Sequence, residues 1–165
     1  SSVLELPQPI VEERKYIVEL TGKVEGSIDS KITQTYLTAE PGCEVRLRKR
    51  EWDGKCVYVH TNKKRISESE QLETERQISS NLYTSLLQQA DPYRSTIMKL
   101  RKSFIWKGQY FELDNYLEPM TGLMILETKG VADDEDVKFP PFLKVLKDIT
   151  GNKDYYNYNL AIKKR

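Results

Sequence analysis

Apolar and polar residues alternate with a period of two along most of this chain. In residues 10–20, Tyr16, Val18 and Leu20 fall on one side of the alternation, and Glu13 and Lys15 fall on the other. Successive side chains of an extended strand point to opposite faces, so residues two apart share a face. The pattern therefore predicts strands that carry one apolar face and one charged face.

Seven further stretches show strand-like patterns, and turn residues separate several of them. They are residues 33–38, 43–50, 55–63, 71–78, 95–104, 109–117 and 122–130. Asp53-Gly54 is a strong hairpin signal between two of these stretches. Two helices are also expected, one capped by Ser79 or Ser80 and one that runs from Pro140-Pro141 to Gly151. About eight strands with two or three helices predict an α+β domain built on a closed, eight-stranded antiparallel barrel.

Charged residues of both signs stand two apart on the polar faces of these strands. The same-face pairs are Glu13 and Lys15, Arg46 and Arg48, Glu73 and Glu75, Lys99 and Arg101, and Glu112 and Asp114. If the barrel closes, these pairs line its interior. Buried charges need a partner, hydrogen bonds or a ligand, so the pattern indicates a tunnel that binds a polyanion. The alternative is that they form a solvated outer face, which is common in antiparallel sheets.

Composition and charge narrow the classes of function. The chain has 165 residues, with 26 Lys and Arg against 25 Asp and Glu, so its overall charge does not indicate nucleic-acid or membrane-surface binding. The chain has a single histidine, which argues against a His-Cys zinc site and against a Ser-His-Asp triad. No apolar run is long enough for a membrane span and no signal-peptide pattern is present, so we expect a cytoplasmic protein. We interpret residues 1–7 as a leader or an expression remnant and residues 8–165 as one domain, and leave open a larger multidomain parent.

A series of short motifs, in this order, resembles the CYTH domain of the triphosphate tunnel metalloenzyme superfamily. The motifs are Glu13-Arg14-Lys15-Tyr16, Thr35-Tyr36-Leu37, Val45-Arg46-Leu47-Arg48, Thr61-Asn62-Lys63, Glu73-Thr74-Glu75, Lys99-Leu100-Arg101, Glu112-Leu113-Asp114, Thr150-Gly151, Tyr155-Tyr156-Asn157 and Leu160-Ala161. The chain also resembles the CYTH-like domain of TRPL-translocation-defect-type eukaryotic proteins, to which phosphoinositide binding is attributed.

The resemblance implies a barrel that holds triphosphate, together with one or two divalent cations. The phosphate-binding residues that it implies are Lys15, Arg46, Arg48, Lys63, Lys99, Arg101 and Lys129. The catalytic residues that it implies are Glu13, Glu75 and Asp114. The ligands that it implies for Mg²⁺ or Mn²⁺ are Glu13, Glu112 and Glu127. Arg and Lys suit phosphate oxygens, and carboxylates suit these hard cations.

Two departures from the family pattern affect the metal site. Val11 and Lys129 replace two of the three glutamates that the resemblance implies as ligands, and neither side chain can coordinate a cation. We therefore expect a domain that binds a phosphorylated small molecule or lipid headgroup, such as a triphosphate, a nucleotide or an inositol phosphate, beside a degenerate metal site. A metal-dependent hydrolase of inorganic or nucleoside triphosphate is one alternative, and a structural interaction module is the other, so whether the chain is an enzyme stays open.

Overall fold

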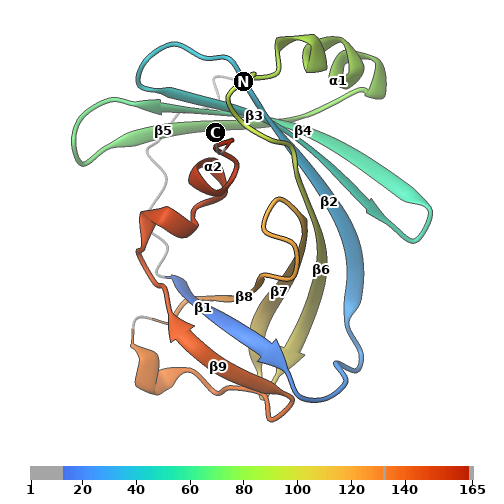
Figure 1. Ribbon diagram of the computed structural model, residues 1–165, viewed down its shortest axis with the longest axis vertical. Coiled ribbons are helices and arrows are strands. Elements are labelled where there is room, and N and C mark those ends of the chain that lie inside the picture. Colours follow the sequence, from blue (N-terminus) through green and yellow to red (C-terminus); the bar gives the residue numbers. More distant parts are fainter. Residues whose placement is uncertain (1–12, 132, 164–165) are drawn as a thin grey trace.

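The computed structural model describes residues 13–131 and 133–163, which form one antiparallel sheet with a few short helices (Figure 1). The strands are β1 (Glu13–Leu20), β2 (Ile28–Leu37), β3 (Cys43–Trp52), β4 (Lys55–Arg65), β5 (Gln71–Ile78), β6 (Ile97–Trp106), β7 (Gln109–Glu118), β8 (Met124–Lys129) and β9 (Leu143–Asp148). The helices are α1 (Ser80–Leu86) and α2 (Asn157–Leu160), with short 3₁₀ turns η1 (Leu87–Gln89), η2 (Asp134–Asp136) and η3 (Lys153–Tyr155).

The sheet differs from the predicted barrel in strand number and in closure. Its strand order is β5-β4-β3-β2-β6-β7-β8-β1-β9, and within the described ranges the edge strands β5 and β9 do not pair with each other. The prediction of eight strands was wrong, because β9 adds a ninth. The sheet nevertheless curls strongly, so that β3, β4 and β5 lie across from β1 and β8, with α2 in the space between them (Figure 1). The α+β class, mostly antiparallel sheet with few helices, is confirmed.

The ninth strand forms where the sequence predicted a helix. Phe142, Val145, Leu146 and Ile149 have helical spacing, but residues Leu143–Asp148 are extended and pair with β1. In that register Leu143 lies opposite Leu20 and is buried, while Leu146 is exposed. Pairing with a free strand edge supplies backbone hydrogen bonds and buries Leu143, and this tertiary contact outweighs the local helical pattern.

Two local predictions from the sequence are confirmed. Asp53 and Gly54 join β3 to β4 and have positive φ angles of 50° and 72°, the backbone of a type I′ hairpin turn. The Ser79 hydroxyl accepts a hydrogen bond from the backbone N–H of Leu82 at 3.1 Å and so caps α1. None of the described helices has the length and hydrophobicity needed to cross a bilayer.

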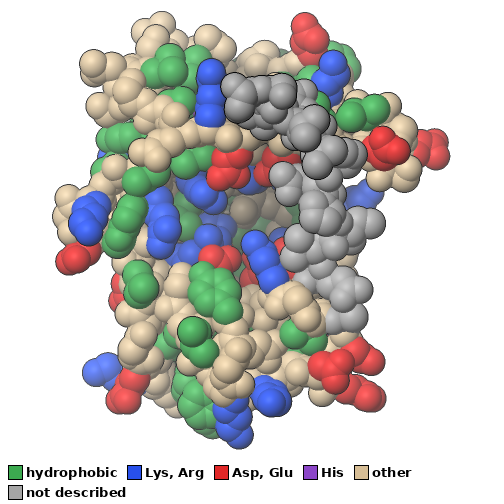
Figure 2. Space-filling model, turned by 180° about the vertical axis from the view of Figure 1, so that it is seen from behind, with side chains coloured by type: hydrophobic (Ala, Val, Ile, Leu, Met, Phe, Trp, Pro, Cys, Tyr) green, Lys and Arg blue, Asp and Glu red, His purple; other side chains and the backbone are tan. Residues whose placement is uncertain are grey.

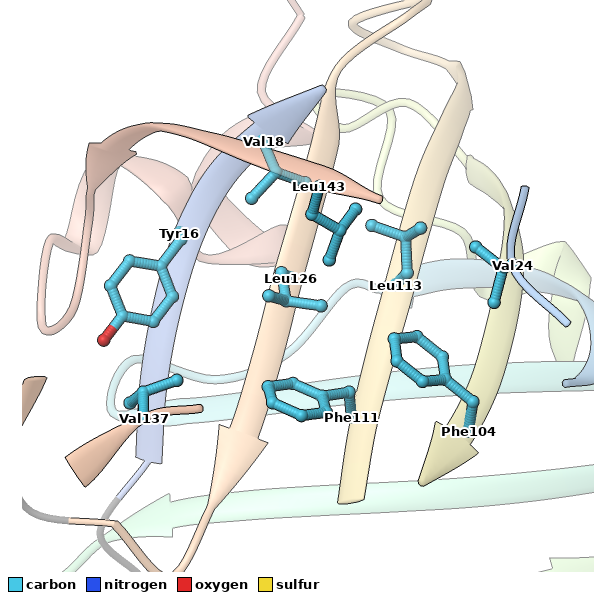
Figure 3. Packing of buried hydrophobic residues seen from close by; sticks show 9 residues of the cluster. All are labelled: Tyr16, Val18, Val24, Phe104, Phe111, Leu113, Leu126, Val137 and Leu143. Carbon is cyan, nitrogen blue, oxygen red and sulfur yellow. The ribbon is translucent and has the colours of Figure 1, made fainter. Parts of the chain in front are cut away.

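Apolar side chains on the outer face of the curl form the main core (Figure 3). It contains Tyr16, Val18, Val24, Phe104, Phe111, Leu113, Leu126, Val137 and Leu143, all buried. The four strands β1, β8, β7 and β6 contribute most of them, and segments around Val24, Val137 and Leu143 cover them. The outer face is therefore packed against protein over these strands, which leaves the charged side chains on the inner face.

A second core covers part of the inner face. Tyr36, Ile97, Tyr116 and Ile125 point inward, and Ile149 and Ala161 from the C-terminal segment pack against them. The C-terminal segment with α2 thus occupies the apolar part of the curl (Figure 1). The charged part of the inner face lies beside it.

Candidate phosphate-binding site

The pairing register places every predicted site residue of the described chain on the inner face of the sheet, which we call the concave face. Directly opposed residues of neighbouring strands point to the same side, so the face can be followed from strand to strand. The residues on it are Glu13, Lys15, Arg46, Arg48, Lys63, Glu75, Lys99, Arg101, Glu112, Asp114, Glu127 and Lys129. Figure 2 shows a hollow in the molecule in which Lys and Arg side chains gather, with acidic side chains beside them.

Three arginines of β3 form a row on this face without acidic neighbours across the sheet. Arg46, Arg48 and Arg50 alternate with Leu47 and Lys49 along the strand. The residues directly opposite them on the flanking strands are all uncharged: Tyr36, Gln34 and Ile32 on β2, and Thr61, Val59 and Val57 on β4. The neighbouring strands therefore leave the positive charge of this row, here called the arginine row, uncompensated at the opposed positions.

Two buried donors in the arginine row have no partner in the part of the chain that the structure describes. The Nε atoms of Arg48 and Arg50 are buried and have no hydrogen-bond partner among the described residues. The Arg48 guanidinium has one carboxylate at the limit of an ion pair, Glu75, at 4.0 Å. Burial lowers the pKa of Arg48, Glu75 opposes this shift, and Arg46, Arg101 and Arg50 lower the pKa further. An unpaired buried donor costs about 1–3 kcal/mol, so the row is arranged for an anion that the described chain itself does not supply.

Sequence reasoning missed Arg50. The signal was present, because Arg50 continues the alternation of Arg46 and Arg48 by one more step.

On β6 and β7, by contrast, the basic residues are paired with carboxylates inside the protein. The Lys99 Nζ lies 2.8 Å from Asp114 Oδ2, and Arg101 donates from Nε to Asp114 Oδ1 at 2.7 Å and from Nη2 to Oδ2 at 3.0 Å. Arg101 Nη1 also lies 3.3 Å from Glu112. Only 3% of the Lys99 side chain and 7% of the Asp114 side chain are exposed. These four residues form a neutral network that fixes one wall of the concave face.

The network sets the protonation of its members. Burial alone would raise the pKa of Asp114, but Lys99 and Arg101 lower it to about 2. Burial lowers the pKa of Lys99, and the adjacent Asp114 opposes that shift. A carboxylate with so low a pKa is a weak proton acceptor near neutral pH, so Asp114 suits the positioning of Lys99 and Arg101 better than general-base chemistry.

Glu13 and Glu127 form a second acidic cluster, on β1 and β8. Lys15 lies opposite Glu127, and Lys129 lies opposite Glu13. Burial and a hydrogen bond with Glu13 raise the pKa of Glu127 to about 7. The Lys15 Nζ lies 3.8 Å from Glu13, whereas Lys129 is exposed. The charged form of Glu127 is thus disfavoured by burial and by the neighbouring carboxylate.

The remaining predicted residues lie toward one end of the concave face. The Lys63 Nζ is 3.7 Å from Glu44 Oε2, and Glu75 is exposed on β5. Lys63 and Glu44 line a cavity of about 600 Å³, together with Lys153 and Tyr156 from the C-terminal segment. A second cavity of about 540 Å³ is lined largely by side chains of the opposite face, such as Leu100 and Met124, and is separate from the arginine row.

The described residues fit a divalent cation only in part. They contain no group of three or more His, Cys, Asp or Glu side chains that converges on a point, and Val11 lies outside the described residues. Glu13 and Glu127 remain as a pair, since Arg101 engages Asp114 and Glu112. Mg²⁺ is commonly held by one or two carboxylates when phosphate oxygens and water complete its coordination. The pair therefore fits a cation that arrives with a phosphorylated ligand.

Comparison with known proteins identifies the fold. No family model matches the sequence, and a search of curated proteins finds no match. Among solved structures, two of NE1496, one of them described as an inorganic triphosphatase, are 26% identical to this chain, with TM-scores of 0.68 and 0.67. They cover 93% and 95% of this chain and 99% and 97% of their own. This likeness supports the resemblance of the chain to the CYTH, or triphosphate tunnel, superfamily.

A more distant solved structure supports the fold alone. The PH1819 protein from Pyrococcus horikoshii OT3 is 18% identical, with a TM-score of 0.51, and the match covers 76% of this chain and 81% of that one. The resemblance to TRPL-translocation-defect-type proteins stays a prediction, as do the roles of the individual site residues in this chain.

Proposed function

We propose that this CYTH domain binds a phosphorylated polyanion of the triphosphate type on its concave face. The observation that carries the proposal is the arginine row, whose three guanidinium groups have uncharged neighbours across the sheet. Two of the three have buried Nε atoms without a partner among the residues that the structure describes. A guanidinium presents two parallel N–H donors to phosphate oxygens, and such charge-assisted bonds are stronger than neutral ones.

The acidic residues of the concave face direct the anion toward β3. Asp114 and Glu112 neutralise much of the charge of Lys99 and Arg101, so those residues contribute less free positive charge than β3 does. Lys15 beside Glu13 extends the basic surface on the far side of the curl. Several adjacent anionic groups are needed to compensate the row, which favours triphosphate over a single phosphate.

Isothermal titration calorimetry with inorganic triphosphate tests the proposal. We expect binding in the presence of EDTA, and a loss of about tenfold or more in affinity for Arg48→Gln, because that variant removes a charge-assisted contact from a poorly hydrated site. Arg76→Gln is the matched control, since Arg76 lies exposed on the outer face of β5, opposite His60. An absence of heat with wild-type protein, or an equal loss in both variants, refutes the proposal.

Hydrolysis of triphosphate is the second candidate. The likeness to the inorganic triphosphatase NE1496 over nearly the whole chain favours it, as does the Glu13–Glu127 pair, which fits a cation accompanied by phosphate. Phosphate release from inorganic triphosphate and from ATP, measured with Mg²⁺ and with Mn²⁺, distinguishes the two candidates. Turnover that needs the metal and disappears in Glu13→Gln establishes hydrolysis, whereas binding without turnover leaves the domain as a binding module.

A further inference from the structure

Arg50 lies at the end of the arginine row nearest the β3–β4 turn. Two residues of a strand span about 7 Å, so the backbone positions of Arg46 and Arg50 are about 13 Å apart. Arg46 and Arg48 belong to the motif by which the sequence resembles the CYTH domain, whereas Arg50 lies outside that motif. The proposed function treats the three arginines as one row and does not distinguish the role of Arg50 from those of Arg46 and Arg48.

The described surroundings of Arg50 contain no negative charge that pairs with it. Its opposed neighbours are Ile32 and Val57, and none of the described carboxylates lies within 4.0 Å of its nitrogen atoms. Its Nε is buried without a hydrogen-bond partner. The guanidinium carbon lies 4.8 Å from the ring centroid of Trp52, the next residue on the same face.

Contact with Trp52 alone does not account for this arrangement. An arginine above an aromatic ring uses the flat face of the guanidinium, while its N–H groups lie in the plane and stay available as donors. The ring of Trp52 therefore restricts the side chain of Arg50 and leaves its donor edge free. A donor edge that is held in place and left unpaired is suited to a further anionic group.

We propose that Arg50 is a specificity-determining residue that contacts a phosphoryl group beyond those held by Arg46 and Arg48. The site then favours linear chains of four or more phosphoryl groups over triphosphate. This inference rests on the proposed function, because it extends the same row of arginines by one contact.

The test compares ligands of different length on matched variants by titration calorimetry in EDTA. The ligands are inorganic triphosphate, inorganic tetraphosphate and ATP, and the variants are Arg50→Gln, Arg50→Lys and the outer-face control Arg76→Gln. We expect wild-type protein to bind tetraphosphate about tenfold more tightly than triphosphate, as one added charge-assisted contact predicts. Arg50→Gln should weaken tetraphosphate binding more than triphosphate binding and so abolish the preference. Arg50→Lys should retain part of the preference, and Arg76→Gln should retain all of it.

Each contrary outcome has a distinct meaning. An unchanged preference for tetraphosphate in Arg50→Gln overturns this inference while the triphosphate site stands. An equal loss for both ligands shows that Arg50 does not distinguish them by chain length and also overturns the inference. A loss confined to ATP shows that Arg50 and Trp52 contact the nucleoside instead of a phosphoryl group. If wild-type protein binds none of the three ligands, the proposed function itself fails. Thermal unfolding of each variant confirms that it is folded.

Discussion

The network around Asp114 gives the sharpest prediction for stability. Asp114 accepts hydrogen bonds from Lys99 and from two nitrogen atoms of Arg101, all at 2.7–3.0 Å, in a site where its side chain is 7% exposed. Asp114→Asn keeps the shape of the side chain and removes its charge. Two cations then remain largely buried beside a neutral amide, one of whose ends is itself a donor.

Two independent arguments give the magnitude. Removing one partner of a buried ion pair typically costs about 3–5 kcal/mol, because the remaining charge is left uncompensated. The pKa of Asp114 falls from 3.8 to about 2 on folding, a linkage that corresponds to about 2 kcal/mol of stability. A lowered pKa means that this stability is present above pH 4 and is lost as the pH falls through 2. We therefore expect Asp114→Asn to lower the free energy of unfolding at pH 7 by about 2–5 kcal/mol.

Urea denaturation at pH 7 measures this loss, and the chain supplies a matched control. Asp29 and Lys102 also lie 2.8 Å apart, but their side chains are 61% and 38% exposed. An exposed pair contributes about 0–1 kcal/mol, so Asp29→Asn should change little. If the two substitutions have equal effects, the Asp114 network is not the buried, mutually dependent unit described above.

Two further predictions concern the Glu13–Glu127 cluster. Because folding raises the pKa of Glu127 from 4.5 to about 7, the folded state binds more protons between these values. Stability should therefore fall by about 3 kcal/mol as the pH rises through that range. Urea titrations from pH 5 to 8 should show a weaker dependence of stability on pH in Glu127→Gln. An unchanged dependence in that variant would mean that other groups cause it. Lys129→Glu places a third carboxylate opposite Glu13, so triphosphate binding should become tighter with Mg²⁺ than with EDTA, and equal calorimetric affinities in the two conditions would contradict that ligand geometry.

Alternation in the sequence was sufficient to assign the charged residues to one face. Arg46, Arg101 and Asp114 lie on different strands, yet each follows the period of two that a pleated strand imposes on its side chains. The same alternation placed Phe111 and Leu113 in the outer core, where they are fully buried. The face to which a side chain points is set within each strand, so the alternation in the sequence is enough to predict it.

Properties that depend on pairing between distant segments were not predictable in this way. Residues 142–149 fit an amphipathic helix, and only the free edge of β1 converts Leu143–Asp148 into β9. The sequence likewise gave no indication that Asp114 would neutralise Lys99 and Arg101 while the opposed neighbours of Arg48 stay uncharged. That difference depends on strand order and register, and it determines which basic residues remain available for a ligand.

The central claim is that the arginine row binds the phosphoryl groups directly, and NMR of arginine Nε–H groups tests it most directly. With ¹⁵N-labelled protein in EDTA, inorganic triphosphate should shift the Nε–H signal of Arg48, whose donor has no partner among the described residues. The signal of exposed Arg76 on the outer face should stay in place. Shifts confined to Arg76, or no shift at saturating triphosphate, would contradict the account.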